Sequence, residues 1–294
     1  MKRFTGTVGN LMRNRKAAVG IIILAICLFA ALFPGVIASD SPTATAYLPN
    51  QLPSGAHWLG TTQLGQDVFS QLIHSTRLTL WVTLVVTSIA TLISMVVGIT
   101  AAYVGGVTDR VLMIITDIFL ILPVLPLLIL LAAYLAPGVT SLIIVLTITS
   151  WAFQARQLRS QGLAIRNRDF LIAARVRGES ALYIIFREIV PTMTSLLAAS
   201  FLGLAIFVVG FAASLQFLGL GNSSELMWGT MLYNAQQGAA LESGNAWWAL
   251  APGAAVAFLG AGFALVNYAF DEISNPALKP VRRKRKRKRV RASA

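Results

Sequence analysis

Few residues of this chain carry side chains that could do acid–base, nucleophilic or metal chemistry. Asp117 lies inside a run of apolar residues, where an acid is costly to bury and often belongs to a proton or substrate pathway. The alternative is that Asp117 lies near the cytoplasmic interface and pairs with a basic residue. His57 and His74 have no acidic or cysteine partner at ligand spacing, so we interpret both as ordinary surface or interface residues.

Motifs of catalytic and nucleotide-binding sites are missing from the sequence. The patterns GxxxxGK[ST], HExxH, GxSxG and paired cysteines do not occur. The single cysteine, Cys27, lies in an apolar run and allows no internal disulfide. We therefore expect no catalytic residue, no metal site and no cofactor in this chain, and no enzyme activity.

Long apolar blocks separated by short polar segments dominate the chain. Of its 294 residues 56% are hydrophobic and 12% are charged, against roughly a quarter charged in soluble proteins. The blocks are long enough to cross the hydrocarbon core as helices, and they cover 17–38, 78–104, 111–136, 139–155, 192–220 and 247–270. Pro123 and Pro126 should kink the third block. A cleaved signal peptide is the alternative for the first, although its 22 residues are long for one. The sequence predicts an all-α membrane protein with six transmembrane helices.

Basic residues gather at the ends of the chain and between the apolar blocks. Five precede Ala17, seven lie between Arg156 and Arg187, ten lie from Lys279 onward, and Arg110 occupies the 105–110 turn. Arg77 is the one that remains. Because basic residues favour the cytoplasmic side, we expect both termini in the cytoplasm and Arg77 outside.

The same distribution divides the chain and bears on its partners. We expect a first part at 1–77, a five-helix core at 78–272 that includes a cytoplasmic loop at 156–191, and a basic tail at 273–294. A tail of this composition is typical of a nucleic-acid patch, but it also binds anionic lipid. A nucleic-acid protein spreads its basic residues over a folded surface. We therefore expect membrane lipid as the tail's partner and no nucleic acid.

The cytoplasmic loop contains two short helical patterns, from Asp169 to Pro191. The first carries Ala173 and Ala174 and ends at Gly178, which suits a left-handed position after a helix. The second has an apolar stripe at i, i+3, i+4 and i+7, formed by Leu182, Ile185, Phe186 and Ile189. Pro191 suits the first turn of the next helix. A helix–turn–helix between two spans could receive force from a soluble partner; an ordinary amphipathic loop is the alternative.

This loop resembles the EAA loop of ATP-binding-cassette importer permeases. That motif is written roughly EAA, three residues, G, nine residues, then I-x-L-P. Ala173, Ala174, Gly178 and Pro191 match it, whereas Ile172 replaces its glutamate, Val190 its leucine, and Glu188 stands at its isoleucine. Asp169 still places an acid one turn earlier, at the positive end of the helix.

A second stretch resembles the LGTDxxGRDxxSR signature of the dipeptide/oligopeptide/nickel permeases, C-type subunit. The matching residues are Leu59, Gly60, Thr61, Gly65, Asp67 and Ser70, while Thr62 and Gln66 depart from the signature. The resemblance continues through the segments 103–117 and 217–229 and covers about residues 10–278.

This resemblance implies a type I importer permease with a cytoplasmic coupling helix, in a bacterial or archaeal inner membrane. It implies three kinds of partner: a second homologous permease, cytoplasmic ATP-binding subunits that hold ATP and Mg, and an extracytoplasmic substrate-binding protein. It also implies that Ala173, Ala174 and Gly178, with Asp169 and Pro191, form the coupling site. The expected substrates are di- or oligopeptides, with oligosaccharides, nickel or another small solute as alternatives. A proton-coupled secondary transporter built around Asp117 and a scaffold without transport activity are further alternatives.

Overall fold

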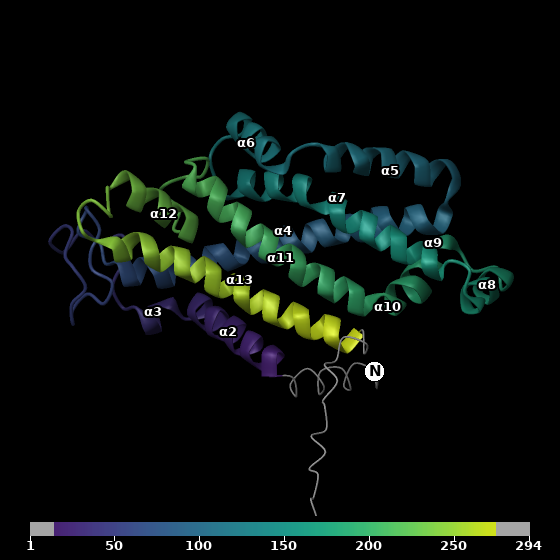
Figure 1. The fold of residues 1–294 in the computed structure, drawn as a ribbon, viewed down its shortest axis with the longest axis horizontal. Helices are drawn as coiled ribbons and strands as arrows, with labels where there is room; N and C mark the ends of the chain where they lie inside the picture. Colours follow the sequence, from purple (N-terminus) through teal and green to yellow (C-terminus); the bar gives the residue numbers. More distant parts are fainter. Residues whose placement is uncertain (1–14, 275–294) are drawn as a thin grey trace, which may run out of the picture.

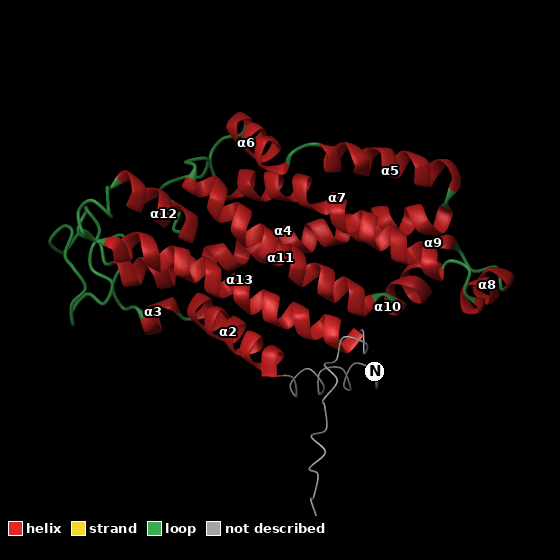
Figure 2. Ribbon diagram, in the orientation of Figure 1, coloured by secondary structure: helices red, strands yellow, loops and turns green. Residues whose placement is uncertain are grey.

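The computed structural model describes residues 15–274, which form one bundle of roughly aligned helices (Figures 1 and 2). The long helices are α2 (Arg15–Leu32), α4 (Val68–Val104), α5 (Gly106–Ile121), α7 (Val139–Ile165), α11 (Thr194–Phe217) and α13 (Ala246–Ser274). The shorter ones are α3 (Pro34–Ile37), α6 (Val124–Tyr134), α8 (Asp169–Val176), α9 (Ala181–Tyr183), the π-helix η1 (Ile184–Ile189), α10 (Val190–Thr192) and α12 (Trp228–Gln237). Within this part of the chain, β structure is limited to one bridge between Thr61 and Asp67.

The number of membrane-crossing helices agrees with the predicted all-α membrane fold. In residues 15–274, α2, α4, α7, α11 and α13 are long and apolar enough to span, and α5 with α6 makes a sixth if the bent pair is one span. The predicted basic tail lies outside the described residues, apart from 273 and 274 at the end of α13.

The third predicted span is broken rather than kinked. Helices α5 and α6 meet at 91°. Leu122, just before Pro123, has an extended backbone with φ −69° and ψ 131°, as the ring of a following proline favours. Pro123 then precedes α6, and Pro126 falls in its first turn, where the missing amide hydrogen removes no helical bond.

Helix α4 is longer than its apolar block. It begins at Val68, ten residues before the predicted start, and so crosses the boundary placed after residue 77. Its 37 residues give a length of about 55 Å, well beyond the ~30 Å hydrocarbon core. Small residues allow α7 to pack closely along it. A Cβ on Gly98 would overlap the carbonyl oxygen of Ala155, and one on Gly162 would lie 2.7 Å from Ala102.

The two polar regions lie at opposite ends of the bundle. In Figure 1 the segment 38–67 and α12 lie at the left, and α8 lies at the right. The segment 222–245, between the last two apolar blocks, contains α12. This helix forms because Trp228 and Met231 are buried against α4 and α13, and the Trp228 indole donates to the carbonyl of Leu72 at 3.1 Å.

Candidate functional site

Helix α8 projects from the end of the bundle and is fixed there by one side. Leu171 and Ala174 are fully buried. They pack in a cluster with Ile99 of α4, Leu158 of α7 and Ile184 of η1. The short helix is therefore attached to the ends of two long ones.

Gly178 ends α8 in the conformation predicted from the sequence. Its φ is +78°, and the turn makes both hydrogen bonds of a Schellman motif. The amide of Glu179 donates to the carbonyl of Ala174 at 3.2 Å, and the amide of Gly178 donates to that of Arg175 at 3.0 Å. A Cβ at Gly178 would meet nothing within 4 Å, so glycine is needed here for its backbone freedom and not for space.

The segment after the turn does not bury the predicted stripe. Ile184, Ile185 and Ile189 are buried, whereas Leu182 and Phe186 are exposed. The reason is that residues 184–189 form a π-helix, in which the amide of Val190 donates to the carbonyl of Ile185, five residues back. The wider turn brings positions i and i+5 to one face, which an α-helical period does not. Pro191, which has no amide hydrogen, follows immediately in α10.

The outward side of α8 is largely apolar. Val176 is 83% exposed and Ile172 47%, and the two lie one turn apart. Ala173 and Asp169 are exposed beside them. Of the two alanines in the motif, Ala174 packs inside the chain and Ala173 is exposed. Only Ala173 is therefore free to contact another protein. Contact with an ATPase stays a prediction.

Basic side chains connect the C-terminal end of α8 to neighbouring segments. The guanidinium of Arg175 lies over the ring of Tyr103 at 5.2 Å, and Arg177 lies 3.7 Å from both Glu179 and Glu188. The Tyr103 contact joins α8 to the last turn of α4.

At the other end, the second signature folds into a compact loop around two glycines. Gly60 and Gly65 have φ of +77° and +71°. A Cβ at Gly60 would overlap the carbonyl oxygen of Gln51, and one at Gly65 would overlap that of Tyr47. Glycine is therefore needed at both positions for conformation and for space.

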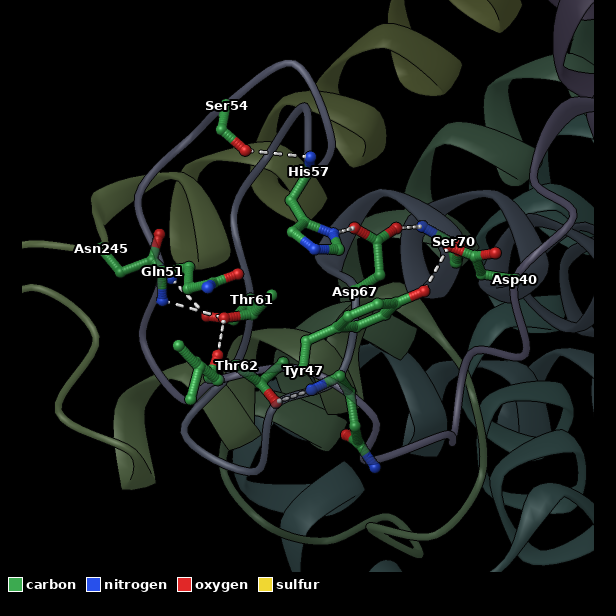
Figure 3. Close-up of polar contacts among 12 residues, drawn as sticks. Asp40, Tyr47, Gln51, Ser54, His57, Thr61, Thr62, Asp67, Ser70 and Asn245 are labelled. Atoms are coloured by element: carbon green, nitrogen blue, oxygen red, sulfur yellow. Dashed lines mark hydrogen bonds and ion pairs between the residues drawn. The ribbon is translucent and has the colours of Figure 1, made fainter.

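Asp67 is the polar centre of this loop (Figure 3). It is the N-cap of α4: one carboxylate oxygen accepts from the amide of Ser70 at 2.7 Å, and the other lies 3.1 Å from Nδ1 of His57. Asp67 and His57 are both buried, and the His57 ring packs on Tyr47. The interpretation of His57 as an ordinary surface or interface residue is wrong, because the nine residues between it and Asp67 fold back so that its ring is buried against the helix cap.

Thr61 connects the loop to Asn245, a residue distant in the sequence. Its hydroxyl donates to the carbonyl of Leu48 at 2.7 Å and accepts from the amide of Gln51 at 2.9 Å. The carbonyl of Thr61 accepts from the amide side chain of Asn245 at 2.6 Å. Leu59 packs against the neighbouring core. All six signature residues are thus brought together at one end of the bundle.

Asp117 is half exposed and forms an ion pair with Arg156 of α7. This geometry supports the pairing alternative and not an isolated proton-carrying acid. A second ion pair joins the same helices, because Arg159 donates through two nitrogens to Asp109 at 2.5 and 2.7 Å. Asp109 was assigned to a turn, but α5 already begins at Gly106.

Three glutamines of α7 were not predicted as site residues from the sequence. Gln154, Gln157 and Gln161 have the spacing i, i+3 and i+7, which places them on one face of a helix. Gln154 and Gln157 line a cavity of about 530 Å³ between α5, α7, α11 and α13. This spacing could have predicted a polar face on the helix, but uncharged amides are a weaker sequence signal than an acid such as Asp117.

Together these features define a multi-pass membrane protein, with the projecting helix α8 at one end and a hydrogen-bonded loop at the other. Residues 94–280 match the family described as the binding-protein-dependent transport system inner membrane component. The chain is 32% identical over 272 residues to the dipeptide transport system permease protein DppC of Bacillus subtilis, covering 90% of this chain and 81% of that protein.

Other relatives and one solved structure agree. The chain is 34% identical over 223 residues to the oligopeptide transport system permease protein OppC of Bacillus subtilis, covering 74% of this chain and 72% of that protein. It is 30% identical over 267 residues to the nickel transport system permease protein NikC of Escherichia coli, covering 88% and 94%. Its fold is similar to a chain of the MetNI methionine ABC transporter in an inward facing conformation. The TM-score is 0.52 at 20% identity, covering 68% of this chain and 96% of that one.

The chain therefore belongs to the family of binding-protein-dependent transport system inner membrane components. It is a permease subunit of an ATP-binding-cassette importer, and its family is a transport component and not a catalytic subunit.

Proposed function

We propose that this permease imports di- or oligopeptides. The observation that carries the proposal is the similarity along 90% of the chain to a dipeptide permease, joined by the match to an oligopeptide permease. Nickel is the competing substrate, because a nickel permease matches over a similar length. The permease works with a second homologous permease, an extracytoplasmic substrate-binding protein and cytoplasmic ATP-binding subunits that hold ATP and Mg.

The orientation we propose places α8 and both termini in the cytoplasm of a bacterial or archaeal cell. It is supported by the 23 of 24 basic residues that this orientation assigns to the cytoplasmic side. The loop around Asp67 then faces the substrate-binding protein. Trp58 and Leu64, both exposed on this loop, offer apolar contact area.

We further propose that α8 is the contact for the ATPase. Its exposed apolar side, formed by Ile172 and Val176, suits insertion into a groove, and Ala173 beside them adds little bulk. The buried side, with Leu171 and Ala174, passes displacement of α8 to the ends of α4 and α7.

The substrate proposal is tested by uptake in cells. A strain that lacks this gene is supplied with the chain and its natural partner subunits, and uptake of radiolabelled trialanine and of ⁶³Ni²⁺ is measured. Trialanine uptake that depends on the chain supports the proposal. Nickel uptake without peptide uptake overturns it.

The contact proposal is tested by a charge at the exposed side of α8. Val176→Asp leaves the core intact because the side chain is exposed, yet it sets an unpaired charge in the apolar contact. We expect the variant to lose co-purification of the ATP-binding subunits. The matched control is Leu241→Asp, a residue 69% exposed near α12 at the opposite end. Equal retention of the ATPase by both variants would contradict the assignment of α8.

A further inference from the structure

The cavity between α5, α7, α11 and α13 combines polar groups with a lack of charge. Ser150, Gln154, Gln157, Ser200 and Asn267 line it, and none of the described residues in its wall is acidic or basic. The rest of its wall is mostly aliphatic and aromatic. A site of this kind favours an uncharged group that forms hydrogen bonds, such as an amide.

Several of these polar groups have no partner within the described part of the chain. Gln154 is 3% exposed, and its side-chain carbonyl accepts from the Thr91 hydroxyl at 3.3 Å, but its amide nitrogen donates to nothing. The side-chain oxygens of Ser150 and Asn267 are also buried without partners. Such atoms are unfavourable in a protein interior, so their convergence on one cavity indicates a ligand.

The unpaired atoms have complementary roles. Gln154 offers a donor, and Asn267, on α13, offers an acceptor. A peptide group presents one carbonyl and one N–H, so its two polar atoms complement this donor and this acceptor. Among the described residues of this lining, a metal ion would find neither a carboxylate nor a thiolate nor an imidazole.

The amide groups continue along α7 as a row. Gln161, seven residues after Gln154, lines a neighbouring cavity of about 250 Å³, and both cavities share Leu196 and Ala199 of α11. Seven residues of helix rise about 10.5 Å, the length of roughly three extended peptide residues. The row therefore matches the main chain of a tripeptide.

We propose that this cavity is a transient binding site for the main-chain amides of a peptide in transit, held by Gln154 and Asn267 with the glutamine row beyond them. The inference rests on the proposed peptide substrate and adds that the permease itself contacts the peptide backbone. Contacts with main-chain atoms do not depend on the peptide's side chains, so one site serves peptides of varied sequence.

The test compares trialanine with its analogue N-methylated at the central amide, using the complete importer in cells. Gln154→Met and Asn267→Leu replace each amide with an apolar group of similar size, and Gln237→Met is the matched control at an exposed position on α12. Uptake is measured at saturating peptide and divided by the amount of the chain in the membrane. The substrate-binding protein is the same throughout, so its own selectivity cancels between variants.

We expect each cavity variant to import trialanine roughly five- to tenfold more slowly than the unaltered chain, and the control to be unchanged. N-methylation should slow the unaltered chain but slow Asn267→Leu no further, because the partner of that N–H is already gone. Cavity variants within twofold of the unaltered chain, or an equal effect of N-methylation in Asn267→Leu, would overturn this inference and leave the peptide substrate standing. Failure of the unaltered chain to import trialanine would overturn both.

Discussion

Replacing Asp67 tests whether the outer signature is a structural cap. Asp67→Ala removes the acceptor for the Ser70 amide at the start of α4 and the partner of His57 in the same step. Asp67→Asn keeps an oxygen for the Ser70 amide, since asparagine is as good an N-cap as aspartate. Its amide can also remain paired with the imidazole.

The magnitude follows from the two contacts. Losing an N-cap costs about 1 kcal/mol, and leaving a buried polar group such as the His57 ring unpaired costs about 1–3 kcal/mol. Asp67→Ala should therefore destabilise the loop by about 2–4 kcal/mol. At ~1.4 kcal/mol per factor of ten, the open form becomes roughly 30 to 700 times more populated. Asp67→Asn should change it by roughly tenfold or less.

Hydrogen exchange of the purified chain in detergent measures this population directly. The informative peptides cover residues 57–70, and peptides from α11 serve as the internal reference for the bundle. If Asp67→Ala and Asp67→Asn accelerated exchange equally, or if Asp67→Ala left it unchanged, the cap would not be what holds the loop.

Three other changes have defined outcomes. Gly65→Ala should destabilise the outer loop by more than about 2 kcal/mol, because the left-handed backbone is strained for alanine and the Cβ would overlap the Tyr47 carbonyl; thermal unfolding in detergent measures it. Gly178→Ala should cost only about 1–2 kcal/mol, since its Cβ would meet nothing, and Gly178→Asn should cost less; exchange of the α8 amides distinguishes them. The hydrogen bond from Tyr47 to the Asp40 carboxylate raises the pKa of Tyr47. Asp40→Asn should therefore lower that pKa toward 10.0, seen as tyrosinate absorbance at lower pH.

The sequence was informative wherever local rules decide the structure. The left-handed Gly178 followed from its place after a helical pattern, and the turn forms with the expected hydrogen bonds. The apolar blocks located α2, α4, α7, α11 and α13 because hydropathy reflects the membrane and not the tertiary contacts.

Features that depend on distant contacts or on small backbone differences could not be read in the same way. The π-helix at Ile184–Ile189 changes which residues share a face, and the α-helical period that predicted the stripe carries no sign of it. His57 is buried because the loop folds onto the cap of α4, a contact set by three-dimensional geometry. The pairing of Asp117 with Arg156 joins residues 39 positions apart.

Helix α4 is one uninterrupted rod between the two polar ends of the bundle. Its first residue follows the Asp67 cap, and Tyr103, near its last, supports Arg175 of α8. A rod of about 55 Å that rotates by roughly 10° about its midpoint moves each end by roughly 5 Å in opposite directions. A tilt of α4 would therefore displace the Asp67 loop and α8 together, without breaking any hydrogen bond of the helix.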